Sequence, residues 1–127
     1  VWPYVEWTAV YNQIDGFKLN VSNNGIGPAL ITNKTIKLNG ETQPNLDSLF
    51  SKMIGTTQFP HLTNNIQKKV LPANASFNIF KTTDPKWSER LFVAFQKNNF
   101  EMEICYESIY KDKWTSTGKD VIESNCE

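Results

Sequence analysis

Gly16–Gly40, with the sequence GFKLNVSNNGIGPALITNKTIKLNG, decides the fold class of this chain. Phe17, Leu19 and Val21 alternate with polar residues, which is the period of a half-buried strand. Turn-forming residues then interrupt the pattern at 23–28. A second run follows in which four apolar residues share one parity: Ile26, Leu30, Ile36 and Leu38. We predict two strands of an antiparallel sandwich that meet at a glycine-rich turn, with Gly25 at positive φ.

Alternation on both sides of this segment predicts further strands. Residues 5–11 place Val, Trp, Ala and Tyr on one parity, and Ile14-Asp15-Gly16 indicates a hairpin into the next strand. Residues 100–106 form the clearest strand of the C-terminal half, and a turn at Asp112-Lys113 leads to a short strand paired with it. The remaining predicted strands are 66–71, 76–81 and an edge strand from Val121.

Two segments have helical spacing. Leu46, Leu49, Phe50 and Met53 would lie on one face of a short helix that Asn45 begins and Gly55 ends. Residues 86–97 suit either a helix or a strand, and we favour the helix. The total is about seven or eight strands with one or two short helices, which is typical of a mainly β sandwich. No linker or repeat divides the chain, so we expect residues 1–127 to form a single domain.

The charge balance narrows the function classes. The 127 residues include 13 lysines and arginines and 13 aspartates and glutamates, so the formal net charge is zero. Nucleic-acid binding depends largely on basic side chains that neutralise phosphates, and docking on an anionic membrane needs a polybasic face. No apolar run approaches the ~18 residues of a membrane-spanning helix. We expect no nucleic-acid partner, and membrane contact only through an anchor that is missing from this chain.

The chain offers little catalytic chemistry. His61 is the only histidine, and we expect it to be a solvated loop residue without a metal or a triad around it. Glu101, Glu103 and Glu107 share one parity of a strand. Paired carboxylates hydrolyse glycosides at a suitable separation, but a solvated strand face explains these three more simply. We predict no catalytic residue, no metal site and no cofactor.

Cys105 and Cys126 are the only cysteines. In the cytosol they would stay reduced, whereas in an oxidising compartment a disulfide between them would add about 3 kcal/mol of stability. We therefore predict the Cys105–Cys126 disulfide on the condition that the chain is exported.

Aromatic side chains remain as candidates for binding. Core and edge packing explains most of the tryptophans and tyrosines. Tyr110 and Trp114 lie near a predicted turn, so they are the best candidates for rings that face a ligand.

Two sets of motifs carry a resemblance to known families. Segments 21–25, 29–31 and 36–40 resemble a strand pair of bacterial immunoglobulin-like domains, so we expect an immunoglobulin-like sandwich. Segments 1–5 (VWPYV), 23–29 (NNGIGPA) and 104–114 (ICYESIYKDKW) resemble the soluble part of uncharacterised bacterial membrane-anchored proteins. In those proteins a Trp-Pro-Tyr segment closely follows a transmembrane helix. The resemblance implies an extramembrane domain whose anchor precedes Val1, and it assigns no functional residue.

These observations lead to a functional expectation. We expect a non-enzymatic, extracytoplasmic or membrane-anchored domain with a binding or structural role, whose partner is a protein or a glycan. The alternatives are a carbohydrate-binding module that uses exposed aromatic rings and a carboxylate-based hydrolase. Exposed rings would favour the module, and convergent carboxylates in a pocket would favour the enzyme. An apolar patch or an open strand edge would favour an interaction domain.

Overall fold

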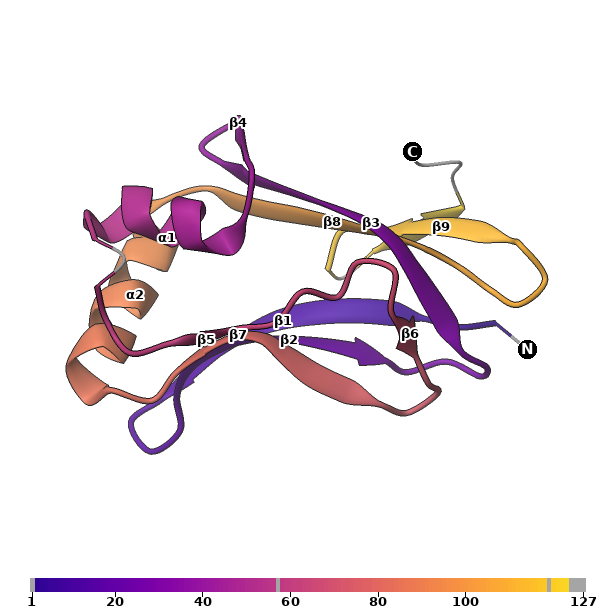
Figure 1. Ribbon diagram of the computed structural model, residues 1–127, viewed down its shortest axis with the longest axis horizontal. Coiled ribbons are helices and arrows are strands. Elements are labelled where there is room, and N and C mark those ends of the chain that lie inside the picture. Colours follow the sequence, from indigo (N-terminus) through magenta and orange to yellow (C-terminus); the bar gives the residue numbers. More distant parts are fainter. Residues whose placement is uncertain (1, 57, 119, 124–127) are drawn as a thin grey trace.

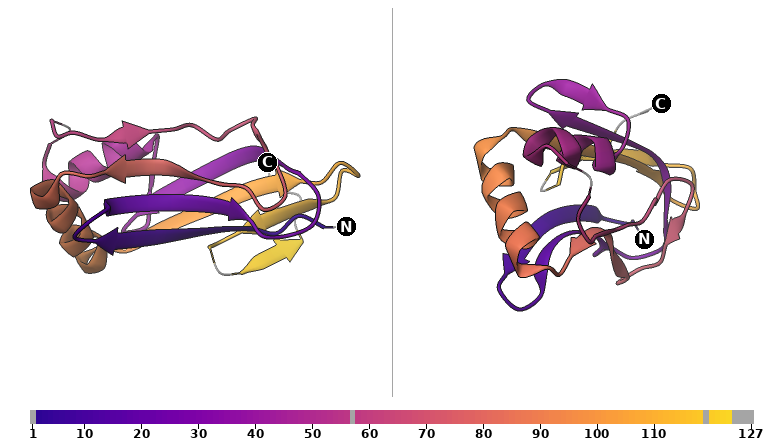
Figure 2. Two further views of the ribbon diagram at one scale, coloured as in Figure 1. Left: turned by 90° about the horizontal axis from the view of Figure 1, so that it is seen from below. Right: turned by 60° about the vertical axis from the view of Figure 1, so that its left-hand side comes forward.

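The computed structural model describes residues 2–56, 58–118 and 120–123. It contains two antiparallel β-sheets and two helices, and the helices lie together at the end opposite the N-terminus (Figures 1 and 2). This confirms the mainly β, two-sheet fold. The strands are β1 (Val5–Asn12), β2 (Gly16–Asn23), β3 (Ala29–Leu38), β4 (Glu41–Gln43), β5 (Leu62–Thr63), β6 (Val70–Leu71), β7 (Ser76–Thr82), β8 (Phe100–Glu107), β9 (Lys113–Ser116) and β10 (Val121–Glu123). The helices are α1 (Leu46–Ile54) and α2 (Pro85–Lys97).

The strands divide between a four-stranded sheet and a six-stranded sheet. The four-stranded sheet has the order β1-β2-β7-β5, and the larger one has the order β10-β9-β8-β3-β4, with β6 also paired with β3. β2 and β3 therefore lie in different sheets, and the glycine-rich turn carries the chain from one sheet to the other. The described residues contain ten strands rather than seven or eight, because two very short strands, β4 and β5, were not predicted.

The face of β3 that is buried in the core changes partway along the strand. Its register on β8 shifts between Ile31 and Asn33. Odd-numbered residues are buried before the shift and even-numbered ones after it, as the buried Ile31 and Leu38 show. A bulge of this kind adds one residue and so reverses the alternation. The four residues Ile26, Leu30, Ile36 and Leu38 were predicted to face the same side of one strand. This prediction holds for Ile36 and Leu38 and is wrong for Ile26 and Leu30.

Asn23 holds the corner between β2 and β3 together, and it is fully buried. Its side-chain oxygen accepts hydrogen bonds from the backbone N–H groups of Tyr4 and Gly25, both at 3.1 Å. Its side-chain nitrogen donates to the carbonyl oxygens of Gly27 at 2.9 Å and Leu71 at 3.0 Å. Both polar atoms of the amide are thus satisfied without water, which allows a polar residue in the core.

Glycine is needed at position 25 because there is no room at this corner for a side chain. The prediction of a positive φ at Gly25 is wrong, since the positive φ in the corner, 91°, belongs to Gly27. A Cβ atom on Gly25 would collide with the backbone of Trp2, Pro3 and Tyr4. The N-terminal segment can therefore pass close to the corner only because residue 25 has no side chain.

Both predicted helices are confirmed, and each has a side-chain cap. Asn45 accepts a hydrogen bond of 2.7 Å from the N–H group three residues later, and Gly55 ends α1 with a φ of 84°. Asp84 caps α2 by accepting a 3.0 Å hydrogen bond from the N–H of Trp87. Such a cap favours a helix over a strand at residues 86–97. Within the described residues, no helix is long and apolar enough to cross a membrane.

The predicted strand at 66–71 is largely absent. Only Val70–Leu71 pairs in a sheet, while Ile66 is fully buried in the preceding loop. The apolar residues of this segment pack as a loop against the core. The predicted strand at 76–81, the β8–β9 hairpin and the edge strand from Val121 are confirmed.

The core fills the space between the sheets and continues under the helices. Phe17, Leu19 and Val21 are fully buried, as their alternation predicts. At the helix end, the ring of Phe50 on α1 lies 4.2 Å from that of Phe80 on β7, centroid to centroid. These contacts hold α1 against the four-stranded sheet. The N-terminal segment lies at the opposite end of the molecule.

Candidate functional site

A hollow of about 470 Å³ lies at the end of the molecule that carries the N-terminus. It forms where the segment before β1 meets the last two strands, β9 and β10. Its described lining combines aromatic rings with two carboxylates: Trp2, Pro3, Tyr4, Asp112, Trp114, Val121 and Glu123.

Three aromatic rings form a contiguous group at this hollow. Trp2 meets Trp114 edge to face, with ring centroids 5.5 Å apart and an interplanar angle of 74°. Trp114 in turn stacks on Tyr106 at 5.6 Å and 28°. Trp2 is 58% exposed, whereas Tyr106 is almost fully buried. In this group the indole of Trp2 is exposed to solvent, and it is supported by rings that are packed beneath it.

Tyr106 anchors this group to the sheets. Its hydroxyl oxygen accepts a 3.3 Å hydrogen bond from the backbone N–H of Val5 on β1. Burial raises the pKa of Tyr106 to about 12, although the hydrogen bond from Val5 partly opposes this shift. The phenol is consequently neutral at physiological pH and serves as a fixed apolar support.

The two predicted ligand-facing aromatics lie in different surroundings. Trp114 is half-buried and belongs to the hollow. Tyr110 is 65% exposed on the β8–β9 turn, where its N–H donates a 3.1 Å hydrogen bond to Ser108 Oγ. The ring contacts of Trp114 are with Trp2 and Tyr106, not with Tyr110. Sequence reasoning did not single out Trp2, although Pro3 after it already indicated a constrained position at a strand entry.

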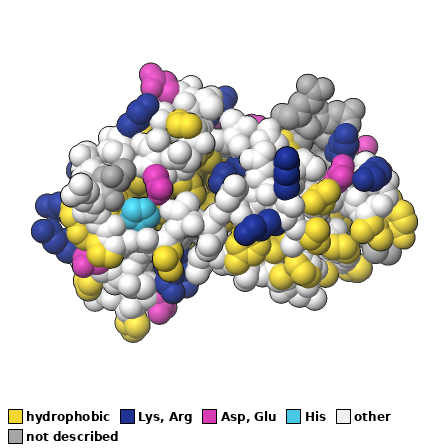
Figure 3. Space-filling model, viewed as in Figure 1, with side chains coloured by type: hydrophobic (Ala, Val, Ile, Leu, Met, Phe, Trp, Pro, Cys, Tyr) yellow, Lys and Arg dark blue, Asp and Glu magenta, His cyan; other side chains and the backbone are white. Residues whose placement is uncertain are grey.

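Further apolar side chains are exposed at the same end. Figure 1 places the β2–β3 corner, β6 and the β8–β9 turn there, and Figure 3 shows hydrophobic side chains gathered over this part of the surface. The exposed apolar residues on these elements are Ile26, Val70, Ile109 and Tyr110. Concentration of exposed apolar residues at one end is typical of a contact surface.

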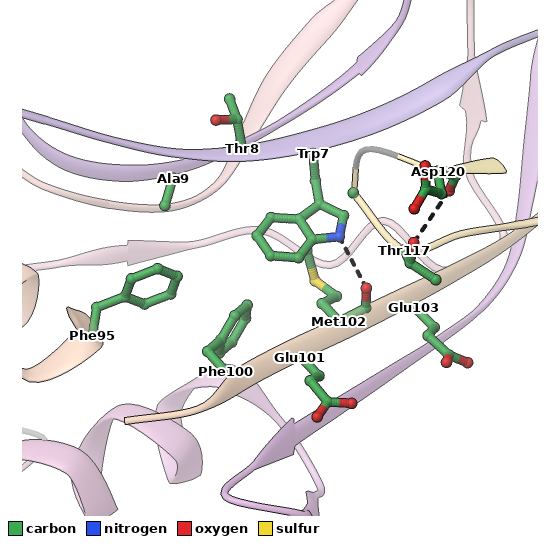
Figure 4. A pocket seen from close by; sticks show the side chains of 11 residues that line it. Trp7, Thr8, Ala9, Phe95, Phe100, Glu101, Met102, Glu103, Thr117 and Asp120 are labelled. Atoms are coloured by element: carbon green, nitrogen blue, oxygen red, sulfur yellow. Dashed lines mark hydrogen bonds between the residues drawn. The ribbon is translucent and has the colours of Figure 1, made fainter. Parts of the chain in front are cut away.

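A second concave site, a groove of about 550 Å³, lies between the two sheets on their open side (Figure 4). Trp7 extends from β1 across the groove and donates a 2.9 Å hydrogen bond from Nε1 to the carbonyl oxygen of Met102 on β8. The ring of Phe100 meets Trp7 edge to face at 5.4 Å and lies 5.1 Å from the ring of Phe95. Three residues between β9 and β10 also line the groove: Thr117, Gly118 and Asp120.

The glutamates of β8 do not converge on either site. Glu101 and Glu103 are exposed, and in Figure 4 their side chains point away from Trp7. Glu107 is nearly buried, and its carboxylate lies 3.6 Å from the ammonium of Lys111. The solvated strand face expected for all three is therefore wrong for Glu107.

His61 is not the solvated loop residue that we expected. Its side chain is only 16% exposed, and its ring stacks on Phe80 with centroids 5.5 Å apart. Nε2 lies 3.1 Å from the carboxylate of Asp47, and Nδ1 lies 2.8 Å from the carbonyl oxygen of Phe59. These contacts tie the loop to α1, which is a structural role.

Lys34 is a polar residue on the core side of β3 that sequence reasoning missed. After the bulge it shares the parity of Ile36, and it lies opposite the buried Ile104 of β8. Burial lowers the pKa of Lys34 below its usual value of 10.5. The ion pairs of the described residues do not include Lys34. Only the position of the bulge reveals that this lysine faces inward.

The cysteine prediction stays open, because Cys126 lies outside the described residues. Cys105 is 5% exposed on β8, and its Sγ is 3.9 Å from Thr115 Oγ1. In residues 2–56, 58–118 and 120–123, no three histidine, cysteine, aspartate or glutamate side chains cluster as metal ligands would.

Comparisons with protein-family models, with curated proteins and with solved structures found no match.

Proposed function

We propose that this chain is a non-enzymatic binding domain that holds a glycan in the hollow around Trp2 and Trp114. One observation carries the proposal: the exposed indole of Trp2 stands in a preformed hollow whose lining also includes Asp112 and Glu123. Aromatic rings pack on the apolar C–H faces of sugars, and carboxylates accept hydrogen bonds from sugar hydroxyls. Trp114 and Glu123 lie on strands, and the backbone carbonyl oxygen of Trp2 accepts a 2.8 Å hydrogen bond from the N–H of Ile26, so the site needs little reorganisation to bind.

The location and the finer fold class belong to the same proposal. We place the domain on the extracytoplasmic side of a membrane, held by an anchor before Val1, and we assign the sandwich to the immunoglobulin-like class. The motifs at 1–5, 23–29 and 104–114 support the anchored location, and those at 21–25, 29–31 and 36–40 support the immunoglobulin-like class. In cells that express the natural gene product, detergent but not salt should release the protein from membranes. Recovery in the salt-soluble fraction would contradict the anchor.

A protein partner is the second candidate. It is favoured by the exposed Ile109 and Tyr110 on the β8–β9 turn, next to the hollow. The hydrolase has less support, because Glu101 and Glu103 are exposed at the border of the groove and their side chains point away from Trp7. An acid–base pair needs two carboxylates that flank one bound bond.

Titration with soluble hexasaccharides of glucose, mannose and N-acetylglucosamine tests the glycan proposal. At least one should shift the indole N–H signal of Trp2 in NMR spectra, and Trp2→Ala should weaken its binding at least tenfold. Ile14→Ala is the matched control, because Ile14 is 91% exposed on the β1–β2 turn at the other end of the molecule. Equal binding by Trp2→Ala, or no shift with any of the sugars, would contradict the proposal. Cleavage of a sugar that is lost in Glu103→Gln would favour the hydrolase instead.

A further inference from the structure

We propose that the free edge of β1 is a docking site for an extended peptide segment, which adds to the four-stranded sheet as a fifth strand. β1 is the outermost strand in the order β1-β2-β7-β5, and among the described residues it pairs only with β2. Edge strands present unpaired backbone N–H and C=O groups, which are the groups that bind another strand. The proposal uses residues outside the hollow around Trp2, so it does not depend on the glycan proposal.

The hydrogen bonds near the start of β1 show which of its backbone groups face outward. The N–H of Asn24 donates to the carbonyl oxygen of Tyr4 at 2.8 Å, so Tyr4 faces the β2 side. Alternation in an antiparallel ladder turns the next residue outward, and the N–H of Val5 donates to the hydroxyl of Tyr106 on β8 instead. By the same alternation, three later residues of β1 turn their N–H and C=O groups outward: Trp7, Ala9 and Tyr11.

Most of the features that normally prevent strand addition are missing from this edge, which carries one charged residue, Glu6. Exposed edges are usually very short, or they carry lysine, proline or a bulge. β1 has eight residues, contains neither lysine nor proline, and pairs with β2 in one continuous register. The register shifts of the molecule lie in other strand pairs, β2–β7 and β3–β8. The edge of β1 is therefore open to another strand along most of its length.

The groove beside this edge provides room for the side chains of an added strand. β9 pairs with β8 only at Ile104–Glu107, so among the described residues the preceding half of β8 has no neighbouring strand on that side. The groove of about 550 Å³ lies there, with Trp7, Phe95, Phe100 and Met102 in its lining. Since successive side chains of a strand point to opposite faces, every second residue of the added segment would enter the groove.

The charges around the groove identify the chemistry of the occupant. The ionisable residues of its described lining are all acidic: Asp120 between β9 and β10, and Glu101 and Glu103 on β8, whose side chains point away from Trp7 and so lie at the outer border of the groove. Lys119 lies outside the described residues. A peptide that alternates apolar and polar residues and carries basic ends complements both the apolar floor and the acidic rim. A second copy of the chain, paired edge to edge by a two-fold axis, would instead bring the same carboxylates together.

Amide hydrogen exchange tests the proposal with a defined probe. The probe is an acetylated and amidated heptapeptide in which valine alternates with threonine between two terminal lysines. At saturation, the amides of Ala9 and Tyr11 should exchange at least tenfold more slowly, because they gain partners. The amides of Thr8 and Val10 should change little, because they already face β2. Unchanged exchange at Ala9 and Tyr11 would overturn the proposal.

Two further variants separate backbone pairing from other contacts. Ala9→Pro removes one outward N–H without removing a hydrogen bond to β2, so the protein should fold and bind the peptide at least tenfold more weakly. Ala9→Ser keeps the N–H and is the matched control. If Ala9→Pro does not fold, a second peptide replaces this test. It has the same sequence but is N-methylated at every valine and threonine, so it lacks the N–H donors for strand pairing and should not bind. Equal binding of the methylated peptide would overturn strand addition.

The identity of the occupant has its own controls. Replacing both lysines of the peptide by glutamates should weaken binding at least fivefold, and equal binding would overturn the charge argument. Sedimentation without peptide should show a monomer. A dimer whose formation protects Ala9 and Tyr11 would overturn the proposal in favour of a second copy.

Discussion

The indole nitrogen of Trp7 donates a hydrogen bond to the backbone carbonyl oxygen of Met102, 2.9 Å away. The two residues are 95 positions apart and lie on strands of different sheets. This is a direct polar link across the open side of the sandwich, and it satisfies a carbonyl group that β9 does not reach. The opening between the sheets is thus held at a defined width.

We predict that Trp7→Phe lowers the free energy of unfolding by about 1 kcal/mol, the usual net contribution of one such hydrogen bond. The substitution keeps an aromatic ring against Phe100 while it removes the donor. Urea denaturation measures the change. Trp2→Phe is the control and should change stability by less than about 0.5 kcal/mol, because Trp2 is largely exposed. Equal effects of the two variants would contradict the role of the hydrogen bond.

Substitution of Gly25 should be far more costly than substitution of Gly40. A Cβ at Gly25 collides with the backbone of Trp2–Tyr4, so Gly25→Ala should destabilise the protein by about 3 kcal/mol or more. Gly40 has a φ of 88° but open space around it, so Gly40→Ala should cost only about 1 kcal/mol of backbone strain. Thermal unfolding of the two variants checks the order. An unchanged melting temperature for Gly25→Ala would show that the close approach does not exist.

Asn23→Ala should destabilise the protein by about 2–4 kcal/mol, because it leaves several buried backbone groups unpaired. Asn20→Ala is the control on the same strand. Its amide makes one 3.1 Å hydrogen bond to Asn78 in a half-buried position, so the expected loss is about 1 kcal/mol or less. Chemical denaturation of both variants tests the difference. Similar losses would mean that the corner is not held by Asn23.

Lys34→Met should stabilise the protein at pH 7 and raise its melting temperature by a few degrees. Burial lowers the pKa of Lys34 in the folded state, so the folded protein holds this proton less tightly than the unfolded chain. The free-energy cost of burying the charged ammonium is complete at pH values below the pKa of the folded state. It is relieved as the pH rises toward 10.5, the pKa of the unfolded state. The advantage of the variant should therefore shrink between pH 7 and pH 10.

Lys37→Met is the control for this prediction, because Lys37 lies on the other face of the same strand after the bulge. It should show no comparable pH-dependent gain. A lower melting temperature of Lys34→Met at pH 7 would contradict the inward position of Lys34.

The Cys105–Cys126 disulfide is testable without any variant. Peptide mapping of unreduced protein from an oxidising compartment should recover the fragments of Cys105 and Cys126 linked to each other. Two separately alkylated fragments under native conditions would refute the bond.

The features that were predicted correctly depend on neighbours in the chain. The alternation of residues 5–11 and 100–106 and the caps at Asn45 and Gly55 act within one strand or one turn of helix. Local preferences of this kind are expressed wherever the segment lies, so they are visible in the sequence. The errors arose where another segment intervened: His61 is covered by Phe80, and Gly25 is approached by the N-terminal segment.

The candidate site was predicted only in part for the same reason. Trp114 was recognised as an aromatic near a turn, but nothing near it in the sequence indicates that Trp2 lies 5.5 Å away. The groove likewise depends on how far β9 extends along β8, which is a property of the pairing and not of either strand. Tyr110 was chosen for its position beside a turn and lies outside the group of contacting rings.

The sequence by itself determined a mainly β chain with a capped helix between Asn45 and Gly55, and it favoured a second helix at 86–97, because periodicity and capping are local. Only the tertiary structure decided that β2 and β3 separate into two sheets, that the bulge turns Lys34 inward, and that β1 remains an open edge. These outcomes depend on long-range pairing, in which a one-residue shift exchanges the two faces of a strand.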